Sequence, residues 1–277
     1  MRAGSKRSEK PDSPAEKQRA EPSKRGMESF LKRLIDAFVY LVYPVSCGSC
    51  GRPAGPLFSA GFCRKCLQKI HPFAGPCCSC CGLPLHTLGA GYVDSPLLCG
   101  RCRKSSPPYT ALRSYGPYAG VLRDVIHRFK YGGSLPAGRI VGRLFSQRFS
   151  RGTFGKSVDM IMPVPIDRKR FRERGFNQAE SLARMLAKSW NMGKAVKPLL
   201  VKVRATAPQS GLGEKARRKN VRNVFMLKKN ARVKDKVVIL VDDVVTTGAT
   251  LGECARVLRA GGTRTIYGLT AARTLKH

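Results

Sequence analysis

Cysteines are the residues of this sequence whose spacing points most directly to chemistry. All 11 cysteines except Cys254 lie between Cys47 and Cys102. Eight of them form four C-x-x-C pairs, Cys47/Cys50, Cys63/Cys66, Cys78/Cys81 and Cys99/Cys102. In the first two pairs 12 residues separate the inner cysteines, and in the last two 17. Such spacing is typical of Cys₄ zinc sites, and four thiolates leave no position for water, so we predict two structural zinc ions.

The choice of ligands in the second half of this region is ambiguous at first, because Cys77 and Cys80 also have C-x-x-C spacing. An internal repeat favours Cys78 and Cys81: Cys47-Gly-Ser-Cys50-Gly-Arg-Pro53 matches Cys78-Ser-Cys-Cys81-Gly-Leu-Pro84. His71 and His86 are less favoured ligands. Whether each ion joins neighbouring or crossed pairs stays open. Disulfides are disfavoured, since nothing in the sequence directs the chain to an oxidising compartment.

A second chemical signal is the segment 237–251, where an apolar strand leads into two acids and then a helix. Asp242 and Asp243 are followed by a loop rich in small and hydroxyl residues: Thr246, Thr247, Gly248, Ala249 and Thr250. Amides at a helix N-terminus and threonine hydroxyls donate to phosphate, and glycine allows a close approach. Adjacent carboxylates need donors, and ribose hydroxyls are suitable. The segment predicts a ribose-phosphate site, while the Walker and G-x-G-x-x-G patterns are absent.

The elements that position these acids follow an α/β pattern between residues 111 and 277. Four apolar runs are predicted strands, at 159–165, 198–203, 237–241 and 265–270. Three segments between them have helical spacing: Leu122/Val125/Ile126/Phe129, Ala179/Leu182/Ala183/Leu186 and Leu251/Cys254/Ala255/Leu258. We predict a parallel sheet flanked by helices, in which Cys254 is a small buried apolar residue.

The segment 237–251 resembles the phosphoribosyl-pyrophosphate motif of type I phosphoribosyltransferases. With the cysteine pairs, three more segments extend the resemblance to the ComF family of competence-associated proteins: Phe129-Lys-Tyr-Gly132, Pro163-Val-Pro165 leading to Arg174-Gly-Phe-Asn-Gln178, and Thr206-Ala-Pro-Gln209 followed by Arg217-Arg-Lys-Asn220. The similarity covers the chain from about residue 30 onward. It implies a phosphoribosyltransferase-like domain behind a double zinc ribbon.

The resemblance also implies how phosphoribosyl pyrophosphate would bind with Mg²⁺. Asp242 and Asp243 would hold the ribose, and the loop after them the 5′-phosphate. Basic residues that follow Pro163 would neutralise the diphosphate: Arg168, Lys169, Arg170, Arg172 and Arg174. In an active transferase, a nitrogen nucleophile would displace pyrophosphate at the anomeric carbon. Neither the acceptor nor its base is identified, and the zinc domain is a candidate for the place of the acceptor-binding hood.

The charge of the chain supports a second hypothesis. Lys and Arg number 52 against 17 Asp and Glu, which gives a formal net charge of +35. A surface so basic attracts polyanions. ComF-type proteins are associated with DNA uptake in natural transformation, so the resemblance implies a link to the DNA-uptake machinery. It leaves open a non-catalytic protein that binds single-stranded DNA, with bases stacked on aromatic residues near 129–131 and 171–176. A sensor of phosphoribosyl pyrophosphate is a third interpretation.

Three segments make up the expected domain organisation. Residues 1–26 form a basic tail that is too polar to order itself, residues 27–108 an apolar helix and the double zinc ribbon, and residues 109–277 the transferase-like domain. The helix contains Phe30, Leu34, Phe38 and Leu41 at helical spacing. We expect it to pack on a neighbouring domain, with peripheral membrane contact as the alternative. No apolar stretch suffices for a signal peptide or a transmembrane helix, so we expect a cytoplasmic protein.

Overall fold

The computed structural model describes residues 31, 34, 35, 38, 45–54, 60–85, 96–154, 157–204, 206 and 213–275. The chain divides into two compact units, Met1–Pro44 and Val45–His277. In the first unit, four residues of the predicted apolar helix are described as helical with exposed side chains: Leu31, Leu34, Ile35 and Phe38. The predicted tail at 1–26 and the rest of that helix lie outside the described residues. The predicted boundaries of the three segments stay predictions.

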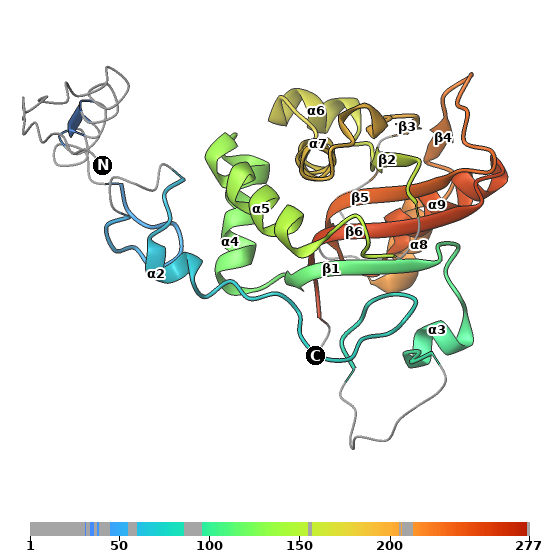
Figure 1. The fold of residues 1–277 in the computed structure, drawn as a ribbon, viewed down its shortest axis with the longest axis horizontal. Helices are drawn as coiled ribbons and strands as arrows, with labels where there is room; N and C mark the ends of the chain where they lie inside the picture. Colours follow the sequence, from blue (N-terminus) through green and yellow to red (C-terminus); the bar gives the residue numbers. More distant parts are fainter. Residues whose placement is uncertain are drawn as a thin grey trace, which may run out of the picture. The chain divides into compact units, whose positions relative to one another are not determined.

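A four-stranded parallel sheet is the centre of the second unit (Figure 1). Its order is β1 (Ala111–Pro117), β6 (Thr265–Arg273), β5 (Val237–Val245) and β2 (Met160–Pro163). The predicted class, a parallel sheet flanked by helices, is confirmed. Strand β5 is longer than predicted, because its ladder with β6 continues through the acids to the pair Val245 and Arg273.

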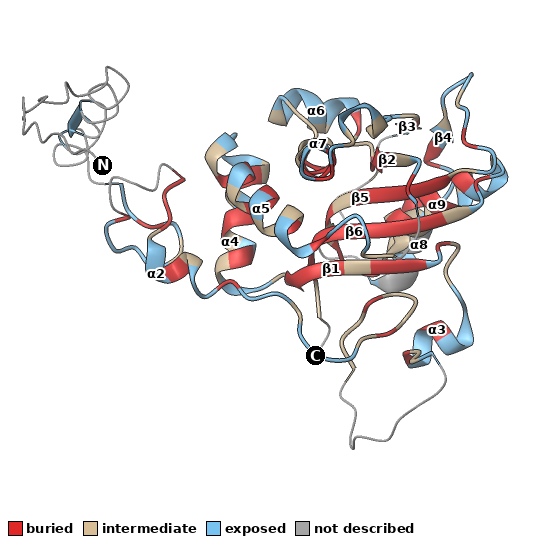
Figure 2. Cartoon of the chain, in the orientation of Figure 1, coloured by how far each residue is buried: buried red, intermediate tan, exposed pale blue. Residues whose placement is uncertain are grey.

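Alternate residues of β5 bury on opposite faces of the sheet. Ile239 and Val241 belong to one core cluster, and Val238 and Leu240 to the other. Strands covered on both faces read as continuous apolar runs. Figure 2 shows this burial along β5 and β6.

Helices cover both faces of the sheet. Three helices contribute to the first core cluster: α4 (Gly120–Tyr131), α5 (Leu135–Arg148) and α7 (Gln178–Ser189). On the other face lie α9 (Ala249–Ala260) and the end of α8 (Glu214–Val221). The shorter helices are α6 (Arg168–Arg174), the 3₁₀ turn η1 (Gly193–Ala195), and α2 (Arg64–Leu67) and α3 (Gly100–Lys104) of the cysteine region. None of the helices in these described ranges is long and apolar enough to cross a bilayer.

One predicted strand lies outside the parallel sheet. β3 (Leu200–Lys202) pairs in antiparallel fashion with β4 (Phe225–Leu227) to form a separate two-stranded sheet. Before β3, Val196 makes a single parallel bridge to Ile161 of β2. Pro198 follows, and since proline has no amide donor, the chain does not continue as a strand of the large sheet there.

The packing of α4 on α5 depends on a glycine. A Cβ atom built on Gly138 would lie 2.4 Å from Cε2 of Phe129, whose ring is fully buried. Phe129 directly precedes Lys130, which lies in the functional site described below. The bare backbone of α5 therefore sets the position of the end of α4.

We expect Gly138→Ala to lower the free energy of unfolding by about 1–3 kcal/mol, because the added methyl overpacks a filled core. Urea denaturation of the zinc-loaded protein measures the change. Gly193→Ala is the matched control, since a Cβ there meets nothing within 4 Å. Equal stability of the two variants would contradict this reading of the helix contact.

Candidate functional site

The eight cysteines of the C-x-x-C pairs form two clusters. One consists of Cys47, Cys50, Cys63 and Cys66, and the other of Cys78, Cys81, Cys99 and Cys102; within each, the sulfur atoms all lie within 4.8 Å of one another. The Sγ atoms of Cys50 and Cys63 are 3.8 Å apart, and those of Cys81 and Cys99 are 3.6 Å apart. A tetrahedral zinc with Zn–S bonds of about 2.3 Å requires sulfur separations of about 3.8 Å. Both clusters fit zinc, and each joins neighbouring rather than crossed pairs.

The two copies of the internal sequence repeat have the same backbone conformation. Gly51 has φ 72° and Gly82 has φ 68°, and each glycine N–H donates to the carbonyl of the first cysteine of its own knuckle. Isolated bridges pair Ser46 with Pro53 and Cys77 with Pro84. Positive φ at the position after the second cysteine closes the turn around the metal site, which explains the glycine in both copies.

The remaining cysteines have other roles. Neither Cys77 nor Cys80 belongs to a cluster, and the carbonyl of Cys80 accepts from the N–H of Leu112, which attaches the second ribbon to β1. His71 is not a member either, and His86 lies outside the described residues. Cys254 belongs to α9 and is buried in the core, and burial raises the pKa of its thiol well above the usual value.

The two acids of β5 lie beside a lysine that the sequence analysis did not include. Nζ of Lys130, at the end of α4, is 3.0 Å from Oδ1 of Asp243. Burial alone would lower the pKa of Lys130, but the charge and hydrogen bond of Asp243 outweigh it and raise that pKa. Lys130 is therefore a fixed cation at the carboxyl end of the sheet.

Asp242 is the less compensated of the two acids. One of its carboxylate oxygens accepts from the backbone N–H of Asp243 at 2.8 Å. Burial, reinforced by the charge of Asp243, raises the pKa of Asp242 to about 7, although the Asp243 amide and Lys130 oppose this. With a pKa of about 7, the Asp242 carboxyl group can take up a proton near neutral pH. As a carboxylate, it can instead bind a cation or accept from a ligand hydroxyl.

The loop after the acids has the geometry of an anion site. Gly248 has φ 77° and is the N-cap of α9, so the first amides of that helix follow it. Ala249 N–H donates to the side chain of Thr247 at 3.3 Å, and the Thr247 carbonyl accepts from Arg101 of the second ribbon. Apart from Thr247, the loop residues named from the sequence line the same cavity as the acids.

This cavity, which we call the ribose cavity after the ligand predicted from the sequence, has a volume of about 610 Å³. Its lining includes both acids and the loop, with Lys130, Tyr131, Arg170, Arg174, Lys202 and Arg217. Thr247 instead lines a neighbouring cavity on the other side of the loop. The volume suits a small phosphorylated molecule.

The basic residues of helix α6 lie on two different sides of the helix. Arg170 and Arg174 line the ribose cavity, whereas Arg168, Lys169 and Arg172 are exposed and line a separate surface groove. Residues four apart share one helical face, which explains why Arg170 and Arg174 lie together at the cavity. The role of all five residues in binding the diphosphate stays a prediction. Arg174 also donates to Gln178 at 3.0 Å and lies over the ring of Tyr131 at 5.0 Å.

A buried ion pair holds α6 to the small sheet. Asp167 is the N-cap of α6: its Oδ1 accepts from the Arg170 N–H at 2.9 Å, and its Oδ2 lies 3.0 Å from Nζ of Lys202. Burial would raise the pKa of Asp167, but these donors lower it. Lys202 also donates to Thr206 at 2.8 Å.

Sequence reasoning missed Lys130, Asp167 and Lys202. Lys130 stood within a quoted motif, and Asp167 stands directly before a basic helix, where an N-cap is expected. No sequence pattern indicates Lys202, because its ion pair with Asp167 is formed by tertiary structure.

Comparison with known proteins agrees with this arrangement. A model of the double zinc ribbon domain matches residues 38–103, and a model of the phosphoribosyl transferase domain matches residues 134–272. The DNA utilization protein YhgH of Salmonella typhi is 33% identical over 238 residues, which is 85% of this chain and all of that protein. The chain belongs to the ComF family.

Two further relatives of this ComF chain have names that refer to competence. Competence protein F of Haemophilus influenzae is 34% identical over 76% of the chain and 91% of the relative. Competence protein ComFC of Bacillus subtilis is 30% identical over 72% of the chain and 78% of the relative. The resemblance given from the sequence is therefore confirmed.

We expect Cys99→Ser to reduce bound zinc from two ions per chain to about one, because a Cys₄ site loses a thiolate ligand. Cys254→Ser should retain both ions, as that thiol is outside the clusters. Elemental analysis of the purified proteins measures the metal content. Unchanged zinc in Cys99→Ser would contradict the assignment of that cluster.

We expect Asp242→Asn to stabilise the ligand-free protein near pH 8 by on the order of 4 kcal/mol, and much less near pH 4. The reason is that the folded-state pKa of Asp242, about 7, lies above the ordinary 3.8. Between these values the folded state holds a proton that the unfolded state has lost, so wild-type stability falls as the pH rises through this window. Urea denaturation at both pH values measures the effect, and a gain that is equal at both would contradict it.

Proposed function

We propose that the ribose cavity binds phosphoribosyl pyrophosphate together with Mg²⁺ and that the chain transfers the phosphoribosyl group to an acceptor. One observation carries this proposal. The acid pair, the loop at the start of α9 and three cations, Lys130, Arg170 and Arg174, line a single cavity of about 610 Å³. The ribose, the 5′-phosphate and the diphosphate would then each have a complementary group in the same cavity.

Asp242 and Asp243 would accept hydrogen bonds from the vicinal ribose hydroxyls. The first amides of α9 and the hydroxyls of Thr246 and Thr250 would donate to the 5′-phosphate, which the helix dipole also favours. Arg170 would neutralise part of the diphosphate from α6. These residues fit Mg²⁺ as well, since it prefers carboxylates and phosphate oxygens.

Catalysis in this cavity would consist mainly of positioning and charge stabilisation. Bound Mg²⁺ would offset the charge that develops on the departing pyrophosphate. Arg170 and Arg174 would donate to the same oxygens, and the ion pair with Lys130 would hold the Asp243 side chain in place against the ribose. The Asp167 N-cap and its bond to Lys202 would hold α6 at the cavity while the charge changes.

The relatives suggest the process in which this chemistry takes place. Their names refer to DNA utilization in one case and competence in the others. We accordingly propose that the chain acts with the DNA-uptake machinery.

Binding of single-stranded DNA is the second candidate function, and the exposed side of α6 favours it. Phe171 is 50% exposed, and it lines the surface groove together with Arg168, Lys169, Arg172 and Lys228. An exposed aromatic ring among cations suits a stacked base and its phosphates.

We expect calorimetry with Mg²⁺ to show binding of phosphoribosyl pyrophosphate to the zinc-loaded wild type. Arg170→Ala/Arg174→Ala should weaken it by about tenfold or more, because both side chains line the cavity. Arg168→Ala/Arg172→Ala is the matched control on the same helix with the same loss of charge, and it should bind within about twofold of wild type. Asp242→Ala/Asp243→Ala should abolish binding. No binding to a folded wild type would refute the proposal.

The same variants separate DNA binding from transfer. If the groove binds single-stranded DNA, Arg168→Ala/Arg172→Ala should lose affinity for an oligonucleotide and reduce its salt dependence. Asp242→Ala/Asp243→Ala should leave that affinity unchanged, since the acids lie in the ribose cavity. Fluorescence anisotropy at several salt concentrations measures both. Equal affinities of the two arginine double variants would contradict a DNA site on this groove.

A further inference from the structure

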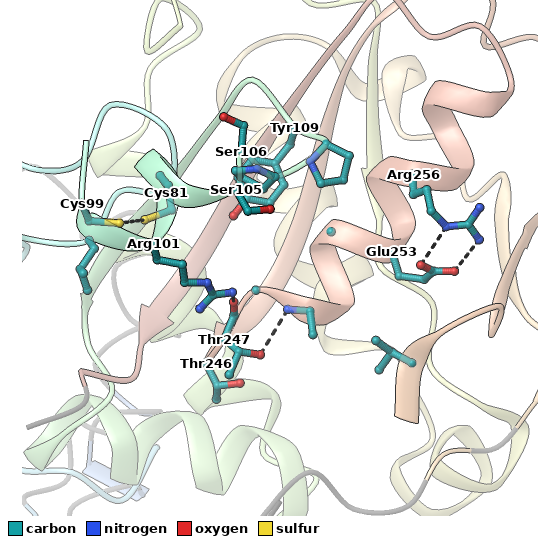
Figure 3. Close-up of a pocket in the computed structure, with 18 of the residues that line it drawn as sticks. Cys81, Cys99, Arg101, Ser105, Ser106, Tyr109, Thr246, Thr247, Glu253 and Arg256 are labelled. Atoms are coloured by element: carbon teal, nitrogen blue, oxygen red, sulfur yellow. Dashed lines mark hydrogen bonds and ion pairs between the residues drawn. The ribbon is translucent and has the colours of Figure 1, made fainter. Parts of the chain in front are cut away.

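Arg101 of the second zinc ribbon contacts the loop that leads into α9 (Figure 3). It lies in the turn from Cys99 to Cys102, between two members of the second cysteine cluster. Its guanidinium donates to the carbonyl of Thr247, a residue that is buried. The metal-binding part of the chain therefore holds one backbone group of this loop.

The orientation of the Thr247 carbonyl fixes the orientation of the amide that follows it. A trans peptide is planar, so the N–H of Gly248 points in the direction opposite to that carbonyl. Thr247 lines only the cavity on the ribbon side of the loop, whereas Gly248 lines both that cavity and the ribose cavity. With its carbonyl bonded to Arg101, the 247–248 peptide directs its amide away from the ribbon, to the side of the proposed 5′-phosphate.

Glycine gives this peptide rotational freedom. Gly248 has φ 77°, and glycine can change the sign of φ at little cost, so the plane of the 247–248 peptide can turn while the chain on either side stays in place. The hydroxyl of Thr247 accepts from the Ala249 N–H at 3.3 Å, a bond that does not involve this peptide. The bond from Arg101 is thus a contact that selects one orientation of the peptide.

Zinc in the second cluster would connect Arg101 to the parallel sheet. Three carbonyls of the other knuckle of this cluster accept from β1 and β6: that of Ser79 from Arg113, that of Cys80 from Leu112 and that of Cys81 from Arg273. The Sγ atoms of Cys81 and Cys99 are 3.6 Å apart and would bind the same ion. One knuckle is therefore attached to the sheet and the other to the loop, and the metal would link the two.

The first ribbon provides a comparison within the same chain. No described residue of that ribbon, between 45 and 70, lines either of the two cavities that border the loop. It packs instead on α4, where the guanidinium of Arg128 lies 6.0 Å from the centre of the Phe62 ring. Loss of metal from the first cluster is therefore a control for loss of metal from the second.

We infer that Arg101 is a positioning residue for the proposed 5′-phosphate site, and that zinc in the second cluster acts through Arg101 to set the affinity of the loop for phosphate. This role rests on the proposed function, which assigns the 5′-phosphate to the loop. Arg101 lines the ribbon-side cavity but not the ribose cavity, so it acts through the 247–248 peptide and not on the ligand. The diphosphate end, at Arg170 and Arg174, should be independent of it.

Two fragments of the proposed ligand separate these ends. Ribose 5-phosphate carries the phosphate assigned to the loop, and pyrophosphate with Mg²⁺ carries the group assigned to α6. In titrations of the full zinc-loaded chain followed by ³¹P NMR, we expect Arg101→Ala to weaken ribose 5-phosphate by about tenfold, the effect of one hydrogen bond to a charged group. The pyrophosphate titration should be unchanged, which general damage to the fold would not allow.

Arg103→Ala is the matched control for Arg101→Ala. Arg103 stands in the same short helix, is exposed, and donates to the carbonyl of Leu98 within its own ribbon. The control removes the same charge and should bind ribose 5-phosphate within about twofold of wild type. Equal binding by wild type and Arg101→Ala, equal losses in the two arginine variants, or no binding of ribose 5-phosphate to wild type at millimolar concentration would overturn the inference.

The role of the metal is tested with cysteine variants of known zinc content. Cys99→Ser should lose ribose 5-phosphate affinity to the same extent as Arg101→Ala, and the double variant should lose no more than either, because both changes act through one contact. Cys50→Ser, which removes a ligand of the first cluster, should bind within about twofold of wild type. Losses that add up in the double variant would overturn the part assigned to zinc.

Calorimetry with phosphoribosyl pyrophosphate and Mg²⁺ on the same samples tests the proposed function separately. If this ligand binds the wild type and Arg101→Ala equally well, the positioning role is wrong and the proposed function stands. If it does not bind the folded wild type, the proposed function fails and the role of Arg101 fails with it.

Discussion

The structure around the site depends on how two adjacent carboxylates are tolerated at the end of a buried strand. The apolar run of β5 must be covered on both faces, which leaves Asp242 and Asp243 where the sheet opens to the ribose cavity. Lys130 compensates Asp243 directly. Burial and the charge of Asp243 leave Asp242 with a raised pKa, which means that the free-energy cost of burying a second carboxylate is not fully offset. A ligand with hydroxyls or a cation would offset more of this cost.

The zinc ribbons are part of this arrangement. The first contacts α4, where Arg128 lies 6.0 Å from the ring of Phe62. The second is bonded to the start of β1 through Cys80 and Leu112, and to the loop at 246–249 through Arg101. Ribbons of this size have little core of their own, so zinc binding supplies much of the free energy that folds them. The folded ribbons can then keep their contacts with α4, β1 and the loop at 246–249. A structural metal would in this way contribute to ligand binding without taking part in chemistry.

The sequence was sufficient wherever a local pattern carries the information. Cysteine spacing and an internal repeat identified both clusters, and an apolar run before two acids identified β5 and its loop. The extension of β5 and β6, the separate sheet of β3 and β4, and the division of the basic residues of α6 between two surfaces were not predicted. They depend on pairing and packing between distant segments. Lys130 and Lys202 were missed for the same reason, since each is defined by a partner far away in the sequence.

The central claim is that one cavity holds all three parts of phosphoribosyl pyrophosphate. A crystal structure of the zinc-loaded protein with this ligand and Mg²⁺ tests it most directly. We expect the 5′-phosphate at the amides of the 246–250 loop, the ribose hydroxyls on Asp242 and Asp243, and the diphosphate facing Arg170 and Arg174. Phosphates bound instead along Arg168, Lys169 and Arg172, with the acid pair still bonded to Lys130 and to the Asp243 amide, would contradict the claim.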